Sequence, residues 1–183
     1  MSSLLKLLGI GGKRETSAKA SAGDTDTVLR ITRELESLEP ALARYVAAFA
    51  FVLGRVAYAD QEINEDETLV MEHFICELGH LSLAQAVLVV DIVKNQHRLF
   101  GGTESFLVTR ELREISSREQ REDLLHCLFA VAAADDSISS DEEAQVRQIA
   151  SELGFDQREY VTVRSAYNDK REVVKMMKEK TSR

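Results

Sequence analysis

Apolar residues recur at intervals of three and four along most of this chain, which places them on one face of an α-helix. A first amphipathic helix is predicted by four such positions, Val28, Ile31, Leu35 and Leu38. Residues 41–59 are apolar on nearly every side, which predicts a central helix buried by the others. No segment alternates apolar and polar residues between turn signals, as a half-buried strand does. The pattern predicts an all-α fold.

Further helices are predicted by apolar spacing and by capping boxes. In a capping box the side chain of a Ser or Asp accepts a hydrogen bond from the backbone N–H three residues later, and the Glu or Gln at that position accepts one from the N–H of the Ser or Asp. Such boxes begin at Ser82, Ser117 and Asp156. The helix from Asp156 is expected to continue without a break into the basic segment REVVKMMKEK at residues 171–180. About eight helices are predicted in all. One of them carries a stripe of apolar residues, Leu69, Val70, Phe74, Ile75 and Leu78.

Two acidic stretches that lie 75 residues apart share one pattern. Asp60–Glu67 reads DQEINEDE, and Asp135–Glu142 reads DDSISSDE. Each follows an alanine-rich apolar run and precedes a helical segment that ends at Leu-Gly, which is Leu78-Gly79 in the first copy and Leu153-Gly154 in the second. The repetition predicts an internal duplication. We expect an internally duplicated helical bundle with a pseudo-two-fold axis, which would bring the two acidic turns to equivalent, facing places.

Composition places the chain among single-domain helical proteins. Its 183 residues are 44% hydrophobic and 30% charged, with one Pro and no Trp. The formal net charge is −8, but residues 1–22 and 169–183 each carry +3, so the segment between them carries −14. An acidic body argues against nucleic-acid binding and favours a cation or a protein partner with a basic surface. We divide the chain into a leader and flexible linker (1–25), an all-helical domain (26–168) and a basic tail (169–183).

The location of the protein is expected to be cytoplasmic. No apolar run approaches the roughly 20 residues that span a bilayer, and the first residues lack a signal-peptide core and cleavage site. Met1–Ile10 holds four leucines and precedes basic residues, so residues 1–19 are candidates for peripheral contact with the anionic inner membrane. The alternative is a frayed terminus or a first turn packed on the body, which is favoured because so short a helix is marginal alone.

The acidic turns are the strongest candidates for chemistry. Carboxylate and carbonyl oxygens are the ligands of Ca²⁺ and Mg²⁺, and a Glu in the first turn of a helix is well placed to supply one. A single turn cannot supply the six or more oxygens that Ca²⁺ takes, whereas two facing turns can. The predicted ligands are Asp60, Glu62 and Glu67 from the first turn and Asp135, Asp136 and Glu142 from the second.

Helix capping explains part of this pattern without a metal. Asn64 and Ser139 are natural N-caps, and Glu67 and Glu142 complete capping boxes three residues later. Acidic groups in a first turn also interact favourably with the helix dipole. The metal hypothesis therefore depends on the carboxylates that capping does not require.

Other kinds of site find little support. The pairs His73/Cys76 and His126/Cys127 lack the four convergent ligands and the spacing of a zinc finger, and the two cysteines suit reduced thiols. The chain has no nucleophile elbow and no phosphate-binding glycine loop, so no catalytic residue is predicted. A carboxylate-metal hydrolase that uses the acidic turns is the least favoured alternative.

From Pro40 to Tyr167 the sequence resembles the TerB-like domains, a family associated with bacterial tellurite resistance. The resemblance rests on D-x-x-I-[NS]-x-x-E, which occurs in both halves, and on the Leu-Gly helix ends. It implies an all-α fold, an acidic surface that binds divalent metal, and a part in stress-response assemblies near the membrane, with no established catalytic activity. Gly, which is frequent after the Asp in this family, is replaced by Gln61 and Asp136.

These observations together predict a divalent-metal-responsive interaction module, without catalysis, in a bacterial cytoplasm. The alternative is a metal-independent helical adaptor that docks a basic partner through its acidic face.

Overall fold

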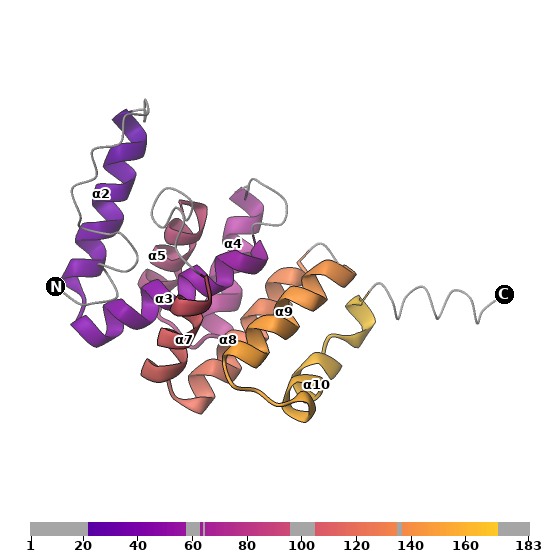
Figure 1. Ribbon diagram of the computed structural model, residues 1–183. Coiled ribbons are helices and arrows are strands. Elements are labelled where there is room, and N and C mark those ends of the chain that lie inside the picture. The colour runs from indigo at the N-terminus through magenta and orange to yellow at the C-terminus, as the bar shows by residue number, and fades with distance from the viewer. Residues whose placement is uncertain (1–21, 58–62, 64, 96–104, 135–136, 172–183) are drawn as a thin grey trace.

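The computed structural model describes residues 22–57, 63, 65–95, 105–134 and 137–171 (Figure 1). These residues form eight α-helices, a short 3₁₀-helix η2 (Asn168–Lys170) and one isolated bridge, without a longer strand, which confirms the all-α prediction of about eight helices. The N-terminal segment 1–19 and the tail beyond residue 171 lie outside this description. The α-helices are α2 (Ala22–Ser37), α3 (Pro40–Ala57), α4 (Glu65–Glu77), α5 (Leu83–Lys94), α7 (Ser105–Ile115), α8 (Arg118–Ala132), α9 (Ser140–Glu152) and α10 (Gln157–Ser165).

Helix α3 is the central element of the bundle, as the sequence predicts (Figure 1). α3 contacts α2, α5, α7, α8 and α9, and every residue from 45 to 54 is buried. Pro40 begins the helix, and the Glu39 carboxylate accepts hydrogen bonds from the next two backbone N–H groups, of Ala41 and Leu42. Among the described residues, α3 is the one helix long and apolar enough to cross a membrane. However, 67% of it is buried inside the protein, so its apolar character matches its central position.

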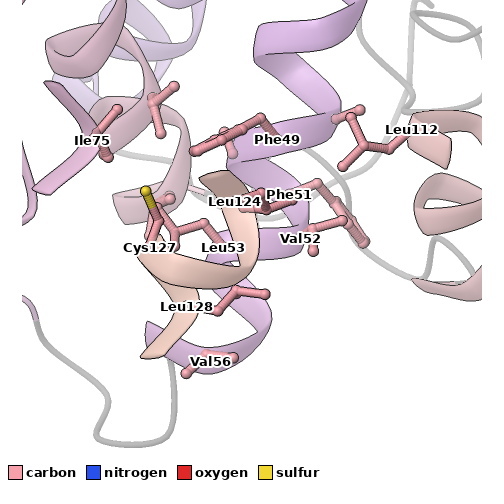
Figure 2. Packing of buried hydrophobic residues seen from close by; sticks show 14 of the residues in the cluster. Phe49, Phe51, Val52, Leu53, Val56, Ile75, Leu112, Leu124, Cys127 and Leu128 are labelled. Atoms are coloured by element: carbon pink, nitrogen blue, oxygen red, sulfur yellow. The ribbon is translucent and has the colours of Figure 1, made fainter. Parts of the chain in front are cut away.

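The two copies of the duplicated segment pack on each other. α3 contacts α8 and α9, and α8 in turn contacts α4. Figure 2 shows α3 and α8 side by side, with Phe49 and Leu124 toward one end and Val56 and Leu128 toward the other. All four side chains belong to one core cluster. The two helices therefore run in the same direction, and the ends that lead into the acidic turns lie on the same side of the core. The pseudo-two-fold axis itself stays a prediction.

The core face of α4 differs from the predicted stripe. Ile75 is buried as expected, but Leu69 is 65% exposed, and Met71 is buried instead. Met71 and Ile75 are four residues apart and share one face of the helix, whereas Leu69 precedes Met71 by two residues and lies on the opposite side. The apolar run at the start of α4 was too short for its spacing to indicate which residue faces inward.

The prediction of one long C-terminal helix is wrong. α10 ends at Ser165, the chain turns through η2, and the backbone N–H of Ile138 donates to the carbonyl of Lys170 (2.8 Å). Tyr167 stacks on Phe129 of α8, with ring centroids 5.1 Å apart. These tertiary contacts outweigh the local helical spacing, because they stack two aromatic rings and pair the backbone within the second acidic turn.

Candidate functional site

The six predicted metal ligands are only partly described. Glu67 lies in the first turn of α4 and is exposed, and Glu142 lies in the first turn of α9 and is half-buried. The other four lie outside the described residues; they are Asp60, Glu62, Asp135 and Asp136.

The second acidic turn ends in the predicted capping box. The Glu142 N–H donates to Ser139 Oγ (3.2 Å), while the Ser139 N–H and hydroxyl donate to Glu142 Oε2 (2.9 and 2.8 Å). Within the described part of the chain, these bonds engage Oε2 alone, so Oε1 is the oxygen that a cation would meet without disrupting the cap. Losing such a cap costs about 0.5–2 kcal/mol. The corresponding cap of the first turn, Asn64, lies outside the described residues.

The helix that leads into the first turn touches the helix that follows the second. The side-chain amide of Gln145, in α9, donates to the backbone carbonyl of Arg55 near the end of α3 (3.1 Å). Gln145 lies three residues after Glu142, and Arg55 lies two residues before the end of α3. The end of α3 and the first half of α9, which are far apart in sequence, therefore lie next to each other.

A buried ion pair fixes this junction. Arg55 Nη1 and Nη2 donate to the two carboxylate oxygens of Glu152 (2.6 and 3.3 Å), and Nη1 also donates to the hydroxyl of Thr109 in α7 (2.8 Å). The two charged side chains are 9% and 10% exposed. Burial by itself would raise the pKa of Glu152, but hydrogen bonds from Arg55 and Gln148 hold it below its ordinary value. The pair sets the register of α3 against α7 and α9.

Glu143, which sequence reasoning missed, binds the start of the basic tail. Arg171 donates from Nε and Nη2 to its two oxygens (both 2.8 Å), and Arg164 donates from Nη1 to Oε1 (3.1 Å). Burial opposes the charge, yet these arginines hold the pKa of Glu143 below its ordinary value. Because two guanidiniums engage this carboxylate, Glu143 is no ready cation ligand. The one signal in the sequence was the opposite charge of the acidic body and the basic tail.

His126 and Cys127, which form one of the two His/Cys pairs, each have a local partner. His126 Nδ1 lies 3.3 Å from the hydroxyl of Tyr167. Cys127 is buried, its thiol lies 3.6 Å from the carbonyl of Phe74, and burial raises its pKa to about 12. Cys76 is also a free thiol. In the described ranges, no three His, Cys, Asp or Glu side chains come together as a metal site. Four of the six proposed ligands lie outside those ranges, so the acidic-turn hypothesis stays a prediction.

Comparison with known proteins gives one match. A family model described as Tellurite resistance protein TerB matches residues 46–165, from within α3 to the end of α10. Searches of curated proteins and of solved structures found no match. The family match spans well over half of the chain and includes both acidic turns. The chain therefore belongs to the TerB family of tellurite resistance proteins.

Proposed function

We propose that this protein is a non-catalytic interaction module whose two acidic turns together bind one divalent cation, Ca²⁺ or Mg²⁺. The observation that carries the proposal is the contact between Gln145 and the carbonyl of Arg55. It joins the end of α3, before the first turn, to the start of α9, after the second. This contact between the helices that flank the two turns supports the proposal that carboxylates from both turns share one ion.

The chemistry of the turns suits a hard cation. Ca²⁺ takes six to eight oxygen ligands, and Mg²⁺ takes six with several waters. The side chains that would provide oxygens are Asp60 and Glu62 in one turn and Asp135 and Asp136 in the other, with Glu67 and Glu142 from the helix starts. The helix dipole adds to the attraction, because α3 and α8 both end at these turns and the carbonyl end of a helix favours positive charge.

An ion bound in this way would act as a clamp between the two copies. It would fix the end of α3 relative to the start of α9, and so hold the neighbouring surface in the form that a partner recognises. We place this activity in a bacterial stress response, as the name of the family suggests, and in the cytoplasm, with the segment 1–19 as a candidate peripheral membrane contact.

Calorimetric titration with Ca²⁺, Mg²⁺ and Zn²⁺, together with thermal melting, tests the proposal. We expect one ion per chain and an increase in stability of about 2.7 kcal/mol at a free ion concentration of 100 times Kd. Asp60→Asn and Asp135→Asn should each abolish binding, whereas Glu114→Gln, on the exposed face of α7, should not. Binding that survives both aspartate changes, or no heat and no change in melting temperature for the native chain, would refute the shared site.

The second candidate function is a metal-independent adaptor that docks a basic partner. What favours it is that two carboxylates at the end of the second turn and just after it already have structural partners, Glu142 in its cap and Glu143 with Arg164 and Arg171. The second turn is then stable without an ion. A silent metal titration combined with retained partner binding would favour this adaptor.

A further inference from the structure

A pocket of about 260 Å³ lies on the side of α3 and α8 where the turn between α4 and α5 approaches the start of α8. Its walls come from Tyr45 of α3, His80 and Leu81 of the turn, and Glu119 and Asp123 of α8. The family match covers most of these residues but assigns them no role. The pocket is separate from the acidic turns in sequence and shares none of the six proposed metal ligands.

The charges in the pocket favour a cationic ligand. Two carboxylates, Glu119 and Asp123, line it, and the facing titratable group is His80, whose Nδ1 lies 3.2 Å from Asp123 Oδ2. Asp123 is 19% exposed, so its charge is poorly shielded by water. Burial, and after it the charge of Asp123, raises the pKa of Tyr45, which keeps this phenol neutral at physiological pH.

The backbone of the pocket wall has an unusual conformation. His80 has a φ of 51°, a left-handed conformation that a side chain other than Gly rarely adopts. In the second copy the corresponding turn uses Gly154, with a φ of 85°. Gly79, which precedes His80, packs so closely that an added Cβ would lie 2.6 Å from the Ile75 carbonyl oxygen. This residue closes the end of α4, where the Leu81 N–H donates to the Ile75 carbonyl (3.4 Å), and its imidazole lies next to Asp123.

The size and lining of the pocket favour an organic cation over a bare metal ion. A water molecule takes about 30 Å³ of liquid volume, so the pocket has room for several non-hydrogen atoms. Among the described residues, no three His, Cys, Asp or Glu side chains are arranged to hold a metal ion, and this includes those that line the pocket. The lining combines two carboxylates with the apolar surfaces of Tyr45 and Leu81, which suits a charged head carried on an apolar stem, as in lysine and arginine.

We propose that this pocket binds a lysine or arginine side chain of a partner protein. The charged head pairs with Asp123 and Glu119, and the alkyl stem lies along Leu81 and the ring of Tyr45. His80 exchanges its contact with Asp123 for the incoming cation. The inference rests on the proposed role as an interaction module, but it does not depend on a metal ion at the acidic turns.

The experiment is an NMR titration of the ¹⁵N-labelled full chain in EDTA, so that a failure of metal binding has no influence on it. The probes are Nα-acetyl-lysine methylamide, its arginine counterpart, and the neutral analogue Nα-acetyl-norleucine methylamide. We expect saturable shifts of the amide signals of residues 79–81 and 119–123 with both cationic probes and none with norleucine. Equal shifts with norleucine, or no saturable shift with any probe, would overturn the proposal.

A further arm distinguishes a side chain from a free small cation. n-Butylamine carries the same single ammonium without a peptide backbone, and we expect it to bind no more tightly than the lysine probe. Binding of n-butylamine more than tenfold tighter would overturn the assignment to a partner protein.

Matched variants locate the site. Asp123→Asn should weaken binding of the lysine probe about tenfold or more, as expected for the loss of a charge-assisted hydrogen bond. Glu119→Gln, at the exposed edge, should weaken it about threefold, because its charge is screened by water. Glu122→Gln is the control, since Glu122 is an exposed carboxylate of the same helix that does not line the pocket. The same spectra report whether each variant folds. Native spectra with unchanged affinity in both Asp123→Asn and Glu119→Gln would refute the site.

Discussion

Replacing Glu152 with alanine tests whether the ion pair with Arg55 holds the two copies together. The change leaves the Arg55 guanidinium, which is 9% exposed, with the hydroxyl of Thr109 in place of a two-oxygen carboxylate. Removing one partner of a buried ion pair costs about 3–5 kcal/mol, because the other charge stays buried without compensation. In a chain of this size each kcal/mol lowers Tm by about 2–4 °C, so we expect a decrease of about 6–20 °C.

Circular dichroism melts and urea denaturation measure this loss. Glu114→Ala is the matched control, because Glu114 also pairs with an arginine, Arg110, but both side chains are more than half exposed, at 61% and 64%. An exposed pair of this kind contributes about 0.5 kcal/mol or less. The double change Arg55→Met with Glu152→Leu should recover most of the stability, since apolar residues often replace a buried pair without loss. A Glu152→Ala protein as stable as Glu114→Ala would refute the reasoning.

Three further predictions follow from the structure. Gly79→Ala should destabilise the protein more than Gly154→Ala in urea denaturation, because the new Cβ at residue 79 would lie 2.6 Å from a backbone carbonyl oxygen. At residue 154 the new Cβ would meet only the flexible side chain of Arg113, and the left-handed φ would cost about 1–2 kcal/mol. The reverse order of stability would contradict this packing. Burial raises the pKa of Cys127 and of Tyr167 to about 12, above their ordinary values of 9.0 and 10.0. The free energy of unfolding should therefore be at its full value below about pH 9 and decrease toward pH 12. Urea midpoints measured across this range should show the decrease, and the decrease should be smaller in Cys127→Ala. Arg171 and Arg164 hold the pKa of Glu143 below its ordinary value of 4.5, so the stability that the Glu143 carboxylate contributes should be present above pH 4.5 and lost as the pH falls below it. The loss of stability in acid should be smaller in Glu143→Gln. Equal acid sensitivity of Glu143→Gln and the native chain would argue against the ion pairs of Glu143 with these arginines.

Local features of this fold could be predicted from the sequence. The capping boxes at Ser82, Ser117, Ser139 and Asp156 all form, because each depends on residues only three positions apart. The central position of α3 also follows from its own composition, since a helix that is apolar on nearly every side has to be surrounded.

Features that depend on distant residues could not be predicted. Gly79 and Gly154 are equivalent in the two copies, yet only Gly154 has a positive φ, and in the first copy His80 adopts it instead. The surroundings of the two glycines also differ, because Gly79 packs close to Cys127 and Phe49 and Gly154 packs close to Arg113, all of which lie on other helices. The end of α10 at Ser165 also depends on distant residues, because the chain that follows it turns back and Arg171 pairs with Glu143 of α9. Spacing along one segment carries no information about such partners.

The most direct test of the shared cation site is paramagnetic broadening by Mn²⁺, which takes the same oxygen ligands as Ca²⁺ and Mg²⁺. Less than one equivalent is added to the ¹⁵N-labelled full chain after treatment with EDTA, and the amide signals of residues 63–65 and 137–139 are followed. The account predicts that both sets broaden in parallel and that excess Mg²⁺ or Ca²⁺ restores them. Broadening of one set alone, or broadening spread evenly over the acidic surface, would contradict a single ion held between the two turns.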